Sequence, residues 1–405
     1  MKRSFAHTVA SFFAFFCVLF IPFPFNITTI QVSITDFIFG KLIGATSSTV
    51  FGKTLSDTRV YSDTISMYIL VLLLFILAIL VSLLLLRIKK GQLYRGRVVS
   101  IFYSLFFYYL ALQLLKYGVD KIFKNQFYLP EPNILYTPLG RVDKDLLYWS
   151  SMGTSHFYNV FLGSLEMLAA LFILIKRTRL VGLVMSLAIL LNVVAVNFGF
   201  DISVKLYSLF LLFLTVYLLI PYCSRLYQLF SEKPVSLKPL FVTVMIKKRV
   251  FLSAFLKWLA LGLICAEVFY PFFKSGNFNG DTAKKPYLHG AYEVKQMIAG
   301  TDTLAIERLP LKRFFIHKDS YMIFQDQDDR MQDYKLSYDK EKGIFVLTDY
   351  EFKQTAIWFH YRQADSILTL KYFSNGNDQE ISGKAVDWRK LTVLQKGFHW
   401  TVDGR

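Results

Sequence analysis

Residues 68–86, with the sequence YILVLLLFILAILVSLLLL, decide the fold class, because nineteen consecutive residues carry no charge. About 20 apolar residues cross the hydrocarbon core of a bilayer as an α-helix, so this stretch predicts a membrane span. The composition of the 405-residue chain agrees, since 54% of its residues are hydrophobic and only 19% are charged. In a typical soluble domain about 25% are charged. The sequence therefore excludes a purely soluble enzyme, a disordered chain and a fibrous repeat.

Six weaker apolar runs predict further spans, which gives seven in total. They lie at residues 5–25, 98–118, 155–175, 180–198, 203–222 and 250–272. Basic residues are unevenly divided between successive flanks of these runs. One set of flanks holds sixteen Lys and Arg, at residues 2–3, 87–97, 176–179 and 225–249, and the opposite set holds seven, at residues 41–59 and 121–144. Because positive residues remain in the cytoplasm, the N-terminus is expected inside and the C-terminal domain outside.

The first run and the two long outer loops carry further topological signals. Residues 5–25 follow Met-Lys-Arg and resemble a secretory signal, but no small-x-small cleavage site comes soon after, so we expect an uncleaved span. The loop at residues 26–64 contains an apolar segment around Phe37 and Leu42, which predicts a short helix in the membrane interface. The loop at residues 119–154 is rich in proline and aromatic residues, which predicts either interface anchors or a cap over a cavity.

The net charge of +17 could indicate a nucleic-acid partner, so its location matters. Residues 1–273 hold 26 Lys and Arg against 11 Asp and Glu, whereas residues 274–405 hold 20 against 18. The excess therefore lies beside the apolar runs, where membrane topology explains it, and we expect no nucleic-acid partner. Cys17, Cys223 and Cys265 lie in or at the end of apolar runs and form no Cys-x-x-Cys pair. We expect no metal site, and the sequence shows no haem, flavin, nucleotide or zinc motif.

The composition changes after Pro271, where a polar linker at residues 274–284 leads into alternating apolar and polar residues. Turn residues recur at about ten-residue spacing from residue 285 to the end, which predicts an antiparallel meander of about eight strands, a barrel or a sandwich. The predicted fold class is therefore a mixed membrane protein, with an α-helical transmembrane bundle of about seven spans and a C-terminal antiparallel β domain. The predicted segments are a helix pair with an outer loop (1–97), a four-helix bundle (98–222), a cytoplasmic loop with the seventh span (223–273), the linker and the extracytoplasmic β-rich domain (285–405).

Ionisable residues within spans are costly and so mark candidate functional sites. Glu166 lies near the middle of its run, and His156, Asn159 and Glu166 share one helical face. The candidate intramembrane polar site consists of Lys116, Asp120, Lys121, His156, Asn159, Glu166, Asn192, Asn197 and Asp201. We expect Glu166 to face the bundle interior near Asn192 or Lys116. The alternative is structural, with Glu166 pairing with Lys116 and bonding to Asn192 to hold helices together.

Short motifs within this region give a family resemblance. Gly118 and Lys121 end one span, Glu166 lies within the next, and a basic turn at residues 176–179 leads into a third. This arrangement resembles the DoxX family of small four-helix membrane proteins, over residues 98–222. An Arg often found within the first family helix has no intramembrane match here, since Arg95 and Arg97 lie at its start. The resemblance implies a four-helix core and an association with membrane redox systems.

The sequence leaves three functions open, and with them the question of whether the protein is catalytic. The first, implied by the resemblance, is an accessory subunit in a membrane redox or quinone-linked process, in which Lys116 or His156 would donate a hydrogen bond to the quinone and Glu166 would accept a proton. The second is a transporter or binding protein for a small solute or lipid. The third is a scaffold whose outer domain, residues 285–405, binds an envelope partner. All three place the chain in the lipid bilayer of the bacterial inner membrane.

Overall fold

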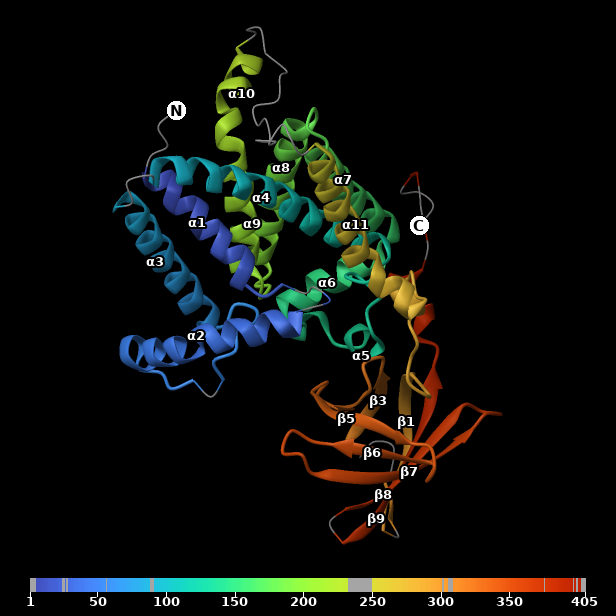
Figure 1. Cartoon of the computed structure of the whole chain (residues 1–405). Helices are drawn as coiled ribbons and strands as arrows, with labels where there is room; N and C mark the ends of the chain where they lie inside the picture. Colours follow the sequence, from blue (N-terminus) through green and yellow to red (C-terminus); the bar gives the residue numbers. More distant parts are fainter. Residues whose placement is uncertain are drawn as a thin grey trace. The chain divides into compact units, whose positions relative to one another are not determined.

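The computed structural model describes residues 5–23, 26, 28–55, 57–87, 91–231, 250–300, 302–304, 309–374, 376–395, 397 and 400–401. These residues form two compact units (Figure 1). The helical unit combines Met1–Gln126 with Phe157–Phe278, and the barrel unit combines Phe127–His156 with Asn279–Arg405. Several residues used in the topology prediction lie outside the described part of the chain: Lys2, Arg3, Lys89, Lys90, Lys233, Lys238, Lys247, Lys248 and Arg249.

Among the described residues, six helices are long and apolar enough to cross a membrane, so the chain is a membrane protein. These spans are Ile65–Arg87, Val98–Ile122, His156–Leu174, Arg179–Gly199, Lys205–Gln228 and Ala254–Thr282. They belong to α3 (Ile65–Arg87), α4 (Gly91–Ile122), α7 (His156–Leu174), α8 (Arg179–Gly199), α9 with α10 (Lys205–Leu219 and Cys223–Phe230) and α11 (Val250–Ser275). The seventh predicted span, at residues 5–25, is represented by the shorter apolar helix α1, Phe5–Phe20. Its 16 residues measure about 24 Å, less than the hydrocarbon thickness of about 30 Å.

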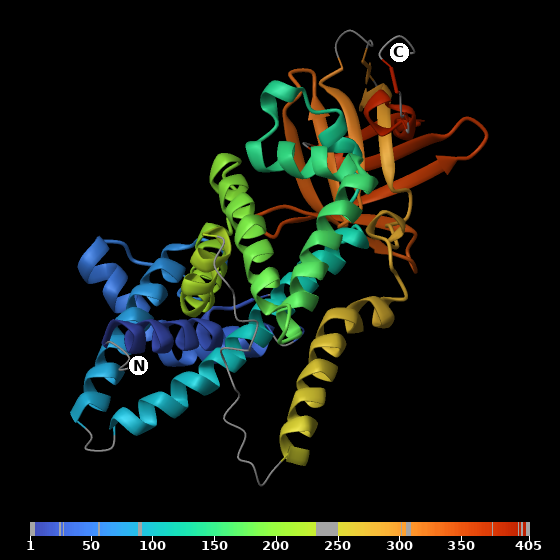
Figure 2. The ribbon, with the colours of Figure 1, turned by 90° about the horizontal axis from the view of Figure 1, so that it is seen from above.

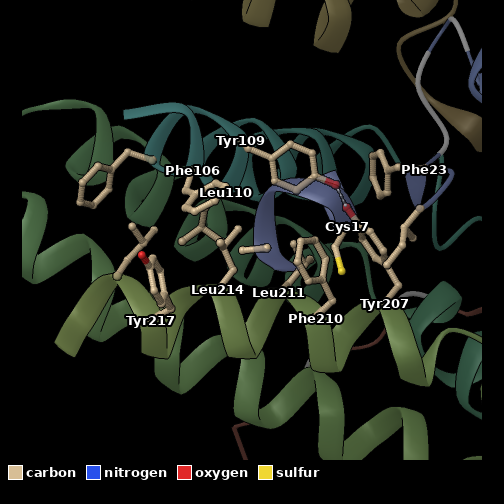
Figure 3. Close-up of a cluster of buried hydrophobic side chains, with 14 of the residues drawn as sticks. Cys17, Phe23, Phe106, Tyr109, Leu110, Tyr207, Phe210, Leu211, Leu214 and Tyr217 are labelled. Carbon is tan, nitrogen blue, oxygen red and sulfur yellow. Dashed lines mark hydrogen bonds between the residues drawn. The ribbon is translucent and has the colours of Figure 1, made fainter. Parts of the chain in front are cut away.

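Aromatic side chains from three helices form much of the core of the helical unit. Figure 3 shows Tyr109 of α4 facing Tyr207 of α9, and their hydroxyl oxygens lie 2.8 Å apart. On α1, the Ser11 hydroxyl lies 2.6 Å from that of Tyr217 on α9. A buried tyrosine hydroxyl needs a hydrogen-bond partner in an apolar interior. These pairs therefore fix the rotation of α1 and α4 against α9.

The outer loop at residues 26–64 forms a longer helix than the sequence suggested. Helix α2 runs over Thr28–Phe51, 24 residues, and buries Phe39 and Ile43 against the unit. Its opposite side carries exposed Ile34, Phe37 and Leu42, and Phe37 is 89% exposed. An exposed apolar helical face of this kind fits contact with lipid. The interfacial location of the helix stays a prediction.

The C-terminal strands close into an antiparallel β-barrel, which confirms the predicted meander and selects a barrel over a sandwich. The strands are β1 (Gly290–Ala299), β2 (Asp302–Thr303), β3 (Leu311–His317), β4 (Tyr321–Asp326), β5 (Met331–Asp339), β6 (Ile344–Thr348), β7 (Gln354–Arg362), β8 (Ile367–Ser374) and β9 (Asn377–Val386). From β3 to β9 each strand pairs with its neighbour in sequence, and β1 pairs with both β3 and β9. This last pairing closes the sheet on itself and leaves the short β2 as an addition on β1.

Large side chains fill the interior of the barrel. The buried core includes Phe314, Phe345 and Leu368. The rings of Tyr292 and Phe314 stack with their centroids 5.0 Å apart. Gly383 makes room for this pair, because a Cβ there would lie 2.4 Å from Cε1 of Phe314. The barrel is therefore a packed core of the kind that small eight-stranded barrels allow.

The segment at residues 127–156 belongs to the barrel unit (Figure 2), although its sequence position placed it within the predicted bundle at residues 98–222. It contains α5 (Pro132–Leu135), η1 (Leu139–Arg141) and α6 (Lys144–Thr154). Leu135 and Tyr136 pack against buried Phe315 and Ile323 on the barrel. The segment therefore covers an apolar part of the outer barrel wall.

A buried acid–base pair fixes this segment to the wall. The Glu131 carboxylate lies 2.7 Å from Nε2 of His289, and both side chains are about 5% exposed or less. The backbone N–H of Lys318 donates to the same carboxylate at 3.1 Å. Burial by itself raises the pKa of Glu131, but its hydrogen bonds with His289 and Lys318 hold the pKa below its ordinary value of 4.5. The stabilisation by this carboxylate is therefore present above pH 4.5, the ordinary pKa. It is lost progressively as the pH falls from there through the lower pKa of the folded state.

His317 makes the stability of the barrel unit depend on pH in a higher range. Burial lowers the pKa of His317 below its ordinary value of 6.5. The unfolded chain therefore binds the proton more readily, and the unit loses stability as the pH falls below 6.5. We expect the amide protection of β3 and β4, measured by hydrogen exchange, to fall between about pH 7.5 and about pH 5.5. His317→Gln should reduce this fall, whereas His360→Gln, at an exposed position, should not. Equal pH dependence in the wild type and His317→Gln would contradict the assignment.

Candidate functional site: a buried ion pair between α4 and α7

Two glycines bring the backbones of α4 and α7 into contact. A Cβ at Gly118 would lie 2.7 Å from the carbonyl oxygen of Gly163, and a Cβ at Gly163 would lie 2.5 Å from that of Gly118. Helix α8 approaches α7 similarly, since a Cβ at Gly182 would lie 2.6 Å from the backbone nitrogen of Ile173. Small residues allow such approaches in membranes, where dispersion and hydrogen bonds drive helix association. The glycines therefore fix the distances among α4, α7 and α8.

An ion pair lies one helical turn beyond the two glycines. Nζ of Lys121 donates to both carboxylate oxygens of Glu166, each at 2.9 Å. The two side chains are only 8% and 6% exposed. Lys121 also lies 5.4 Å from the ring centroid of Tyr117, within the range of a cation–π contact. The pair therefore places a lysine amino group and a glutamate carboxyl group side by side in the helical interior.

The basic turn at residues 176–179 anchors the other end of the same helix contact. Nε of Arg179 donates to the carbonyl oxygen of Ile173 at 2.9 Å. Its guanidinium lies over the ring of Phe107, with 4.1 Å between Cζ and the ring centroid. Arg179 thus satisfies a carbonyl at the C-terminus of α7 and reaches across to α4. Both ends of the α4–α7 contact are therefore held by a basic side chain.

Glu166 pairs with Lys121 and not with Lys116, so the predicted pairing of Glu166 with Lys116 was wrong. Lys116 instead lies 3.8 Å from the Glu267 carboxylate on α11. Five residues separate the two lysines, which turns their side chains about 140° apart on one helix. Lys121 therefore faces α7, while Lys116 faces α11. The side chain of Asn192, the other expected neighbour, is exposed on α8.

The remaining predicted site residues do not gather into one cavity. Asn159 and Asn197 are buried, whereas His156 and Asp201 are exposed. Asp201 accepts from Nζ of Lys205 at 2.7 Å. Asp120 is half-buried and accepts from the side chain of Asn125 at 3.1 Å. The candidate site therefore narrows to Lys121 and Glu166.

Two groups that the structure uses, Glu267 and Tyr117, were not among the predicted site residues. Glu267 lies near the end of its helix, where an acidic side chain can reach the membrane interface without any partner. Its carboxylate instead accepts from the backbone N–H of Asn26 at 2.8 Å and from the Asn26 side chain at 3.0 Å. Tyr117 contacts Lys121, and its position four residues earlier in α4 was the available signal. Among the described residues no group of three His, Cys, Asp or Glu could hold a metal ion.

Comparison with known proteins gives one relative. Over 147 residues the chain is 31% identical to the uncharacterized protein YwoB of Bacillus subtilis (strain 168). The match covers 36% of this chain and 94% of YwoB. The chain belongs to the family of YwoB. No family model matches the chain, and no solved structure gives a significant match.

The close helix approach makes Gly163→Ala a sharp test of the site. The added methyl group collides with backbone atoms of α4, which cannot rotate away as a side chain can. We expect a loss of about 1–3 kcal/mol in unfolding free energy, the usual range for overpacking. Gly262→Ala on α11 is the control, because nothing lies within 4 Å of its Cβ position. Thermal unfolding in nanodiscs measures both variants, and equal stability would contradict the backbone contact.

The ion pair itself is tested by a double-mutant cycle. Lys121→Met leaves the Glu166 carboxylate buried without its cation, and we expect a loss of about 3 kcal/mol. Lys121→Met combined with Glu166→Leu removes both charges and should lose less than the two single variants together. The unfolding free energy in nanodiscs gives the coupling. Strictly additive effects would show that the two side chains do not interact.

Proposed function

We propose that this protein is an accessory subunit of a membrane redox process, and that Lys121 and Glu166 bind the head group of a quinone. The observation that carries the proposal is the buried ion pair, with Nζ 2.9 Å from both carboxylate oxygens. Buried ion pairs often contribute little net stability, because desolvation offsets their attraction. Ionisable residues within membrane spans are by default functional-site hypotheses. The resemblance of residues 98–222 to DoxX proteins supports the redox context.

The chemistry of the pair suits both forms of a quinone. An ammonium donates a hydrogen bond to a quinone carbonyl, and a carboxylate accepts one from a quinol hydroxyl. The adjacent ring of Tyr117 offers an aromatic surface to a planar head group. In this proposal the chain binds and orients the head group, while a partner protein or a diffusible carrier supplies the electrons. The proposal therefore assigns the chain a binding role and no redox cofactor of its own.

The proposed location is the inner membrane of a bacterium, with the N-terminus in the cytoplasm and the barrel unit outside. The division of basic residues between the flanks, sixteen against seven, supports this orientation. The six candidate spans among the described residues support a location in a membrane, where quinones dissolve.

Quinone binding provides the test, with a second ion pair as its control. The full-length protein in nanodiscs is titrated with a short-chain naphthoquinone, and binding is followed by quenching of intrinsic fluorescence. Lys121→Met and Glu166→Gln should each weaken binding at least about tenfold, equivalent to about 1.4 kcal/mol. Lys116→Met and Glu267→Gln alter the neighbouring pair on α11 and should leave binding unchanged. Absence of wild-type binding, or equal losses at both pairs, would contradict the proposal.

A further inference from the structure

The outer wall of the barrel unit carries a groove that the proposed function does not use. Three hollows of about 310, 280 and 380 Å³ lie along it. The first and second share Met331, and the second and third share Tyr321, Asp333 and Tyr350. Because neighbouring hollows share lining side chains, the three hollows adjoin one another and form one groove, called here the wall groove. It follows β4, β5 and the β6–β7 turn beside the segment at residues 127–156.

Two aromatic rings stand exposed at one end of the wall groove. Tyr350 is 79% exposed and Phe352 is 85% exposed, both on the β6–β7 turn. The Tyr350 hydroxyl donates to Asp333 at 2.5 Å, which ties the turn to β5. The Asp349 carboxylate accepts from the backbone N–H groups of Glu351 and Lys353 at 2.9 and 2.8 Å. The turn is thus fixed internally and presents its rings to solvent instead of burying them.

Hydrogen-bond acceptors lie deeper in the same groove. The Asn133 side chain lines the middle hollow and is 8% exposed. Its Oδ1 has no hydrogen-bond partner among the described residues. A buried carbonyl of this kind is costly unless a donor reaches it. Asp333 adds a carboxylate to the same hollow. The groove therefore favours a ligand that carries several hydroxyl or amide donors.

Charge and strand pairing narrow the class of ligand. Charged residues of both signs line the groove. The Lys and Arg residues are Arg141, Arg330 and Lys335, and the acidic residues are Asp143, Asp329, Asp333 and Asp349. This near balance gives no selection for a polyanion or a polycation. The strands that form the wall are paired on both sides, β4 with β3 and β5 and β6 with β5 and β7. A peptide cannot add to them as a further strand.

We infer that the wall groove binds a glycan, with its sugar rings against Tyr350 and Phe352 and its hydroxyl or acetamido groups bonded to Asp333 and Asn133. The apolar faces of sugar rings suit flat aromatic side chains. Their many donors suit the Asp333 carboxylate and the Asn133 carbonyl oxygen, which has no hydrogen-bond partner among the described residues. A lipid surface fits less well, because Asp333 and Asp349 outnumber the single basic residue Lys335 in the hollow that holds the aromatic rings. This site is independent of the ion pair between α4 and α7.

The test uses the full-length protein in nanodiscs and calorimetric titration with two probes, the hexamer of N-acetylglucosamine and cellohexaose. We expect the acetylated hexamer to bind, and Tyr350→Ala combined with Phe352→Ala to weaken binding at least about tenfold. Trp358→Ala is the matched control, since this aromatic side chain is 57% exposed on β7 and does not line the groove. Its affinity should equal that of the wild type. The thermal midpoints of all variants establish that they are folded.

Three outcomes would overturn the inference. The first is that neither saccharide binds the wild type at millimolar concentration. The second is an equal loss of affinity in the Trp358→Ala control, which would place binding elsewhere on the barrel. The third is that the protein in nanodiscs binds no saccharide but binds vesicles of phosphatidylethanolamine and phosphatidylglycerol, and loses this binding in the Tyr350→Ala, Phe352→Ala variant. That result would make the turn a membrane anchor. Retention of quinone binding in the same variants would show that the failure concerns the wall groove alone.

Discussion

The contact between Gly118 and Gly163 is the constraint on which the helical site depends. Where two helices meet at their backbones, side chains that flank the contact come within reach of each other across it. Here these side chains are Lys121 and Glu166, and no larger residue at either glycine would leave them 2.9 Å apart without a shift of the helices. In lipid the two charges have no water to solvate them, so each requires the other. The position of the ion pair therefore depends on the lack of a Cβ atom at Gly118 and at Gly163.

The barrel unit depends on a different kind of constraint, the closure of a sheet. Pairing of β1 with β9 removes the long unpaired edges that an open meander would expose. Closure also leaves an outer face, and the segment at residues 127–156 covers part of it with Leu135 and Tyr136. The buried contact of Glu131 with His289 then holds that segment in register. The same covering segment forms one wall of the groove, so structural packing and the inferred binding surface share their residues.

The division of the chain into a helical part and a β part was predictable because the patterns that mark each are local. An uncharged run such as residues 68–86 can hardly be anything but a span, and period-two alternation such as that around Phe345 predicts a strand. The site was predictable in part. Glu166 could be identified because it is an acidic residue within an apolar run. Its partner could not, because the choice depends on which face of α4 is turned toward α7, and the sequence does not record contacts between helices. Lys116 and Lys121 carry the same side chain, and they differ only in the helix that each faces, α11 for Lys116 and α7 for Lys121.

The sequence by itself determined that this chain spans a membrane and ends in a β domain, because hydrophobic length and alternation are properties of neighbouring residues. It also marked Glu166, since a charge in lipid is costly wherever the helix packs. The tertiary structure decided which lysine neutralises it, that the sheet closes into a barrel, and that residues 127–156 belong with the barrel. Each of these depends on contacts between residues far apart in the chain. Such contacts are set by backbone approach and side-chain fit, which local composition does not record.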